Sequence, residues 1–138
     1  MIYLLDTNAC IRYLNGRSPA VVRKMESLQP RDIAVCAVVK AELFYGAQRS
    51  RDPEQTLAVQ RRFLQPYRSL PFDDAAAEIA GRIRSLLAAQ GTPIGPYDVQ
   101  IAAIALAHGC TLVTHNVDEF GRIPNLAIED WEAADKER

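Results

Sequence analysis

The sequence predicts an α/β protein built around a mainly parallel sheet of short strands that helices cover on both faces. Apolar runs of three or four residues alternate along the chain with longer stretches at helical spacing. These runs lack the alternation of apolar and polar residues that is typical of strands with one face exposed to solvent. The 138 residues suit one domain, spanning residues 1–138, with an exposed acidic tail over about 130–138.

Each expected strand is a short apolar run bounded by residues that favour turns or helix starts. The runs cover residues 2–5, 33–36, 111–113 and 126–128, with a further extended piece at 70–72. Ligands of open α/β sheets bind beyond the carboxyl ends of the strands. The polar residues that follow each strand, such as Asp6, are therefore where we expect the chemistry.

Six segments show apolar residues at helical spacing together with helix start or stop signals. They cover residues 9–14, 19–28, 38–45, 53–64, 74–90 and 96–108. Asn8 and Ser18 are expected to cap the first two segments, and Gly46 is expected to end the third. The sixth segment is apolar nearly all round over 101–107, so it should be buried.

The composition excludes several classes of protein. Sixteen basic and seventeen acidic side chains give a net charge of −1, which excludes histone-like binding through a large positive excess. The scattered cysteines Cys10, Cys36 and Cys110 are typical of reduced thiols in a cytosol rather than of a zinc site. The sequence shows no signal-peptide pattern and no run of about 20 apolar residues. We therefore expect a cytoplasmic protein with no membrane association.

Three carboxylates follow predicted strands or begin a buried helix. Asp6 follows the first strand, Glu42 lies in the helix after the second, and Asp98 lies in the first turn of the buried helix. Singly, each has an ordinary explanation, as a helix cap, a surface residue and a complement to a helix dipole respectively. Together in one crevice they would repel one another unless a cation lay among them, and hard ions such as Mg²⁺ or Mn²⁺ bind oxygen ligands.

Four blocks of the sequence carry a resemblance to a known family. They are LDTN at 5–8, AELFYG at 41–46, IGPYD followed by IAA within 94–103, and LVTHN at 112–116 with the closing DEF and LAIEDW. In order, spacing and total length they resemble the PIN domain, and in particular the VapC-type toxins of bacterial toxin–antitoxin pairs. The match covers nearly the whole chain.

The resemblance implies a three-layer α/β/α sandwich whose acidic cluster binds Mg²⁺, or Mn²⁺ in its place, and cleaves RNA. Asp6, Glu42 and Asp98 fall on the acidic positions of the family and would be both metal ligands and catalytic residues. Attack by a metal-activated water on the phosphodiester would leave a 5′-phosphate and a 3′-hydroxyl.

The fourth acidic position of many PIN domains is occupied differently in this chain. Asn116 stands there, which can offer an oxygen but no charge. We assign Asn116 to the catalytic set and leave Asp118 or Glu119, two and three residues later, as alternatives for that position. Thr7, Asn8, Thr114 and Asp118 are expected to orient carboxylates or metal-bound waters, although Asn8 is equally a plain helix cap.

Two further features have both a functional and an ordinary interpretation. Residues 49–68 carry a net charge of +3, which suits a surface facing phosphates but also a solvated helix. Tyr45, Tyr97 and Phe120 lie near the acidic blocks, where aromatic rings stack bases or, more often, pack in the core.

The resemblance also implies partners. A VapB-like antitoxin would insert a basic segment into the acidic cluster, two copies of the chain would form a homodimer, and the antitoxin would build a higher assembly. The RNA would be a tRNA, with initiator tRNA as the candidate and ribosomal RNA as the alternative. A non-catalytic PIN-like RNA-binding or scaffold domain remains a second hypothesis, while the missing paired acids and late lysine disfavour a phospho-accepting receiver domain.

Overall fold

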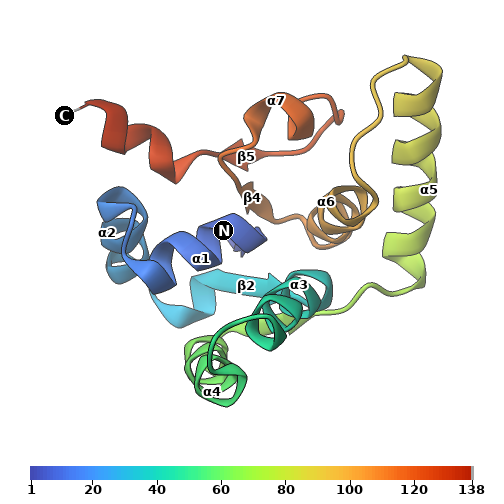
Figure 1. Cartoon of the computed structure of the whole chain (residues 1–138). Helices are drawn as coiled ribbons and strands as arrows, with labels where there is room; N and C mark the ends of the chain where they lie inside the picture. The colour runs from blue at the N-terminus through green and yellow to red at the C-terminus, as the bar shows by residue number, and fades with distance from the viewer. Residues whose placement is uncertain (138) are drawn as a thin grey trace.

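The computed structural model describes residues 1–137 as a five-stranded parallel sheet with helices on both sides (Figure 1). The strands are β1 Tyr3–Leu5, β2 Ile33–Cys36, β3 Arg68–Leu70, β4 Thr111–Val113 and β5 Ile128–Glu129. Their order across the sheet is β3-β2-β1-β4-β5, and every neighbouring pair is parallel. The expected α/β class with a short-stranded parallel sheet is confirmed.

The nine other elements within residues 1–137 are helices or short helical turns packed around this sheet. They are α1 Thr7–Asn15, α2 Pro19–Ser27, α3 Ala37–Gln48, α4 Pro53–Leu64, α5 Asp74–Ala89, α6 Pro96–His108, α7 Val117–Phe120 and the 3-10 helix η2 Trp131–Glu137, while the 3-10 turn η1 Pro30–Asp32 leads into β2. Helices α1 and α2 lie on one side of the strands and α5 and α6 on the other (Figure 1). No helix within residues 1–137 has the length and apolar character needed to cross a membrane.

The core lies where the central strands meet helix α6. Every residue of β2 and β4 is buried, and so are five successive residues of α6, 101–105. The small side chains of Ala102, Ala103 and Ala105 allow this helix to pack closely on its neighbours. The expectation that this helix is buried is confirmed, and its burial fixes the position of Asp98 at its start.

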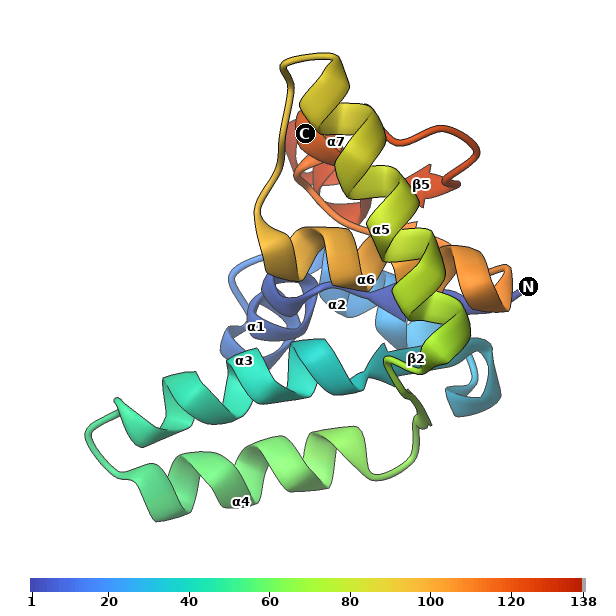
Figure 2. The same ribbon diagram turned by 90° about the vertical axis from the view of Figure 1, so that its right-hand side faces the viewer.

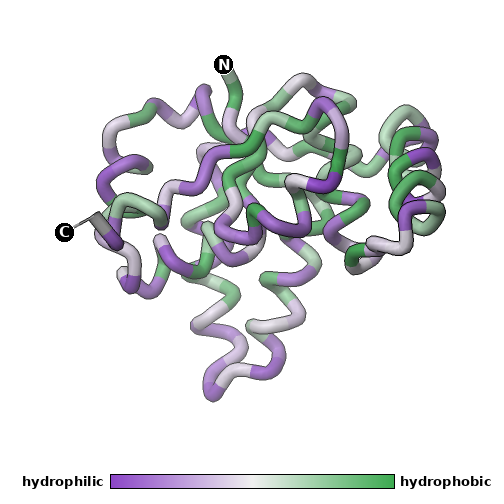
Figure 3. Tube along the Cα trace, turned by 90° about the horizontal axis from the view of Figure 1, so that it is seen from above, coloured by the Kyte–Doolittle hydropathy of each residue, from purple (hydrophilic) through white to green (hydrophobic). Residues whose placement is uncertain are grey.

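Helices α3 and α4 form a hairpin that projects from the body of the molecule (Figure 2). Its far end, which includes Arg49, Arg51 and Asp52, is strongly hydrophilic (Figure 3). The sequence places Gly46 as the end of α3, but the helix continues to Gln48, because Ala47 is fully buried and Ser50, which donates to its carbonyl, also contacts Thr56 of α4. The prediction of a stop at Gly46 was wrong.

The last turn of the described chain packs on α1 and α2 instead of extending into solvent. Trp131 is buried with its ring edge-on to Tyr3, at a centroid distance of 5.4 Å. Asp135 accepts hydrogen bonds from the backbone N–H of Ala20 and from the hydroxyl of Ser18. The prediction of an exposed tail over about 130–138 was therefore wrong for Trp131, Glu132 and Asp135, whereas residues 133, 134 and 136 are exposed and Arg138 lies outside the described residues.

Candidate active site

The site lies where β1 and β4 end side by side. Asp6 follows β1 and Thr114 follows β4, and the backbone N–H of Asp6 donates to the carbonyl of Val113 at 3.1 Å. The chain runs outward from β1 through β2 to β3 and then returns to place β4 on the other side of β1. Such a change of direction opens a crevice at the carboxyl ends of the strands, which is where α/β proteins bind ligands.

Asp6 is a buried carboxylate at the head of α1. Only 7% of the residue is exposed, and its Oδ1 accepts a hydrogen bond of 2.8 Å from the N–H of Ala9. Asp6, not Asn8, therefore caps this helix, and the sequence-based assignment of the cap to Asn8 was wrong. The pKa of Asp6 is raised to about 6, mainly by burial and to a smaller extent by the negative charges of Asp98 and Glu132, while hydrogen bonds from the Thr114 side chain and the Ala9 backbone lower it.

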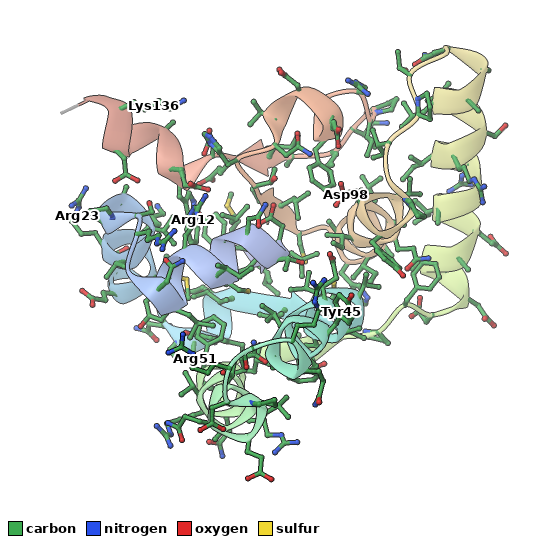
Figure 4. The ribbon with its side chains drawn as sticks, in the orientation of Figure 1. Arg12, Arg23, Tyr45, Arg51, Asp98 and Lys136 are labelled. Atoms are coloured by element: carbon green, nitrogen blue, oxygen red, sulfur yellow. The ribbon has the colours of Figure 1, made fainter. Side chains whose placement is uncertain are left out.

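Asp98 lies in the first turn of α6, after the Gly95-Pro96 start (Figure 4). Its pKa is raised by burial and then by the negative charges of Glu119 and Glu42. Asp98 is thus the carboxylate that connects the others, since its charge also acts on Asp6. Asp98 therefore interacts with one carboxylate from the end of β1, one from α3 and one from α7.

Glu42 is held by a contact between α1 and α3. The hydroxyl of Thr7 donates to Oε1 of Glu42 at 2.9 Å, across 35 residues of sequence. This hydrogen bond uses Oε1 of Glu42 and not Oε2, and it directs the carboxylate toward the start of α1. Thr7, expected to orient a carboxylate, makes that contact.

The segment after β4 brings a further acid to the crevice. The side-chain amide of Asn116 donates to Oε2 of Glu119 at 2.9 Å, and the hydroxyl of Thr114 accepts a hydrogen bond of 3.0 Å from the backbone N–H of Asn116. Glu119 is partly buried and acts on Asp98, whereas Asp118 is exposed. Of the alternatives for the fourth acidic position, Glu119 is the one whose charge reaches Asp98, with Asn116 holding it in place.

The short helix α7 explains why the sequence leaves Asn116, Asp118 and Glu119 as alternatives for this position. Residues 117–120 form a single turn with only two apolar residues, Val117 and Phe120, too short a segment for its helical spacing to predict a helix. The one available signal was the spacing of three residues between Asn116 and Glu119, which places a side chain at a helix start beside one in its first turn. Asn8 is also exposed on α1, away from the buried part of the crevice.

The donor atoms of this crevice fit a hard divalent ion by their chemistry. They are carboxylate and amide oxygens, the ligands that Mg²⁺ and Mn²⁺ prefer. Among residues 1–137, no three His, Cys, Asp or Glu side chains form a ready-made cluster for a metal ion. The charges of Glu119 and Glu42 raise the pKa of Asp98, and the charge of Asp98 raises the pKa of Asp6, so Asp98 lies near enough to the other three carboxylates for their charges to interact.

The chain is similar over most of its length to one protein family and to curated members of that family. The model of the PIN domain family matches residues 3–126, which include Asp6, Glu42, Asp98 and Glu119. A curated relative, the tRNA(fMet)-specific endonuclease VapC of Salmonella typhimurium, is 41% identical over 129 residues, covering 94% of this chain and 97% of the relative. The chain belongs to the VapC group of the PIN domain family.

Solved structures of VapBC complexes contain chains that align with 95% of this one. A chain of VapBC2 from Rickettsia felis, bound to a promoter DNA fragment, aligns with a TM-score of 0.88 at 37% identity, covering 95% of this chain and 99% of that one. A chain of DNA-bound VapBC from Salmonella typhimurium aligns with a TM-score of 0.88 at 40% identity, covering 95% and 98%. The parallel sheet with flanking helices is thus the PIN fold.

Proposed function

We propose that this PIN domain is a metal-dependent endoribonuclease toxin that a cognate VapB-like antitoxin neutralises. The observation that carries the proposal is the connection of Asp98 to Asp6, Glu42 and Glu119 in one crevice at the ends of β1 and β4. Relatives named as ribonucleases and VapBC complexes among the similar structures support it. An acidic crevice of this kind has two natural occupants, a cation with a phosphate and a cationic side chain of an inhibitor.

The residues of the crevice divide into those that would hold the cation and those that position them. Asp6, Glu42 and Asp98 would hold Mg²⁺, or Mn²⁺ in its place, with Glu119 or Asn116 completing the set. A divalent ion bound there lowers the pKa of a water molecule and polarises the scissile phosphate.

Three neutral side chains keep the acids in position. The hydroxyl of Thr7 holds Glu42, and the amide of Asn116 holds Glu119. The hydroxyl of Thr114 hydrogen-bonds Asp6, which favours the ionised form that a cation needs. Cleavage by water with these groups in place would leave a 5′-phosphate and a 3′-hydroxyl.

RNA must be attracted by cations elsewhere, because the crevice itself is negative. An open cleft of about 700 Å³ between α3, α4 and β3 is lined by Lys40, Arg61 and Arg62 and by no carboxylate. These three cations form no ion pair within residues 1–137. Arg and Lys without partners are suited to bind backbone phosphates, and Glu42 lies on the same helix as Lys40.

The proposed substrate is a tRNA, with initiator tRNA as the first candidate, since two relatives are named as tRNA(fMet)-specific endonucleases. We further propose a homodimer, an antitoxin complex built on it, and a cytoplasmic location. The apolar residues of α3 and α4 are the candidate dimer surface.

The test of the proposed cleavage compares the same substitution at two aspartates, each in the first turn of a helix. Asp98→Asn, in the first turn of α6, should abolish cleavage of an initiator tRNA transcript, while Asp74→Asn, in the first turn of α5 and exposed, should cut like the parent protein. EDTA should stop cleavage and added Mg²⁺ or Mn²⁺ should restore it. Mapping of new 5′-phosphate ends in cells after induction would identify the RNA. Binding of RNA without cleavage by the parent protein would favour the non-catalytic alternative.

A further inference from the structure

A recess opens beside the acidic crevice, between α3 and α6. It has a volume of about 600 Å³ and is lined by Thr7, Ala37, Val38, Ala41, Glu42, Tyr45, Tyr97 and Gln100. Thr7 and Glu42 belong to the crevice already described, so the two spaces are continuous. Any ligand that fills this recess also touches the group that holds the proposed cation.

Two exposed tyrosines flank the recess, one from each helix. Tyr45 is 64% exposed and lies three residues after Glu42, on the same side of α3, whereas Tyr97 is 59% exposed and directly precedes Asp98. Figure 4 shows Tyr45 on α3 below Asp98 on α6. The expectation that such rings more often pack in the core holds for Phe120, which is 1% exposed, but not for these two.

The ring of Tyr45 is held in its exposed position by a cation. The guanidinium of Arg49 lies 5.7 Å from the ring centroid, and its Nη1 donates to the hydroxyl of Tyr45 at 3.3 Å. A flat ring with an arginine beside it offers a base a stacking surface and its phosphate a partner, the combination that proteins use for single-stranded nucleic acid.

The recess also offers one free hydrogen-bonding group. The side-chain amide of Gln100 is half-buried in its wall and makes no hydrogen bond within the part of the chain that the structure describes. An amide carries both a donor and an acceptor, so it can pair with the edge of a base.

The charge of the recess argues against a second copy of the chain as its occupant. A protein surface docked there would bury the carboxylate of Glu42 and would have to offset the loss of its hydration. A bound nucleotide could place its base against the apolar wall of the recess and its phosphate in the hydrated acidic crevice, where the proposed cation binds. The position of the tyrosines next to Glu42 and Asp98 places such a base beside the bond to be cut.

We propose that this recess binds an unpaired base of the RNA adjacent to the scissile phosphate, with Tyr45 and Tyr97 as stacking surfaces and Gln100 as the group that reads the base edge. The inference rests on the proposed ribonuclease function. It assigns recognition to residues outside the acidic set.

Binding of a short single-stranded RNA that carries 2-aminopurine tests the proposal, in an Asp98→Asn background with Mg²⁺ present so that the RNA stays intact. Stacking on a ring quenches the fluorescence of this base. The Tyr45→Ala/Tyr97→Ala pair should lose the quenching and weaken binding by about 5- to 150-fold. The Tyr45→Phe/Tyr97→Phe pair should keep both, and Phe72→Ala, an exposed ring elsewhere, should have no effect.

Two results would overturn the proposal. One is unchanged quenching and affinity in the alanine pair; the other is a change of its sedimentation mass, which would make the recess an interface between copies. Cleavage by the protein without substitutions is a separate readout. If that protein cleaves RNA but the alanine pair binds and quenches like the parent, only the assignment of the recess is refuted. Absence of cleavage in that protein refutes the ribonuclease function itself.

Discussion

The buried carboxyl of Asp6 should destabilise the free protein at neutral pH. Burial raises its pKa from 3.8 to about 6, so ionising it costs more in the folded protein than in the unfolded chain. Asp6→Asn removes this cost and keeps an oxygen that can accept the hydrogen bond from the N–H of Ala9. We therefore expect Asp6→Asn to be more stable than the parent protein in the absence of divalent ions.

The size of the effect follows from the pKa. One pKa unit corresponds to about 1.4 kcal/mol, so the rise from 3.8 to about 6 corresponds to about 3 kcal/mol above pH 7. Because the folded protein binds this proton more tightly than the unfolded chain, the parent protein loses stability as the pH rises from 3.8 to about 6. The advantage of Asp6→Asn should fall to about half near pH 5.

Urea unfolding of both proteins in EDTA, near pH 7.5 and near pH 5, measures the difference in the free energy of unfolding. Adding Mg²⁺ near pH 7.5 should reduce or reverse the advantage, because an ion that binds only the folded parent protein stabilises it. An Asp6→Asn protein that is less stable than the parent in EDTA at both pH values would refute the reasoning, since the capping role of Asp6 would then outweigh the cost of its burial.

Two further perturbations test other parts of the molecule. The Arg61→Ala/Arg62→Ala pair should weaken RNA binding, and the slope of the logarithm of the binding constant against the logarithm of the salt concentration should become shallower by about 0.7 for each lost phosphate contact. The Arg82→Ala/Arg84→Ala pair on α5 is the control and should leave both the affinity and the slope unchanged. Equal slopes for the parent protein and the Arg61→Ala/Arg62→Ala pair would exclude α4 as a phosphate surface. Asp135→Ala should lower the free energy of unfolding by about 1–2 kcal/mol, because the backbone N–H of Ala20 in the first turn of α2 loses its hydrogen-bond acceptor. Urea unfolding measures the change. An unchanged unfolding midpoint would mean that η2 does not contribute to the stability of the fold.

The sequence predicts the buried elements well because their signals are local. The run 33–36 forms β2 with the expected bounds, and the Asp73 and Gly95-Pro96 signals begin α5 and α6 where expected. The edge strand was harder: β3 covers Arg68–Leu70 and not 70–72, because two of its three residues face solvent and carry no apolar signal. The last strand is likewise displaced, to Ile128–Glu129.

The site shows the same division between local and long-range information. Asp6, Glu42 and Asp98 could be selected because each follows a strand or begins a buried helix, and the structure connects all three through Asp98. The role of Glu119 depends on the direction in which α7 leaves β4, which no residue of the short segment 117–120 determines by itself. The docking of the tail on α2 depends on a contact between Asp135 and Ala20 that spans 115 residues.

The central place of β1 also determines when the crevice can form during translation. The first strand synthesised, β1, pairs with β4, so the buried environment of Asp6 cannot form until Thr114 has been synthesised. At a synthesis rate of about 5–20 residues per second, that delay is roughly 5–20 s. The acidic crevice of the nascent chain is therefore incomplete through most of elongation, so the proposed cleavage cannot begin until the C-terminal part of the chain has been made.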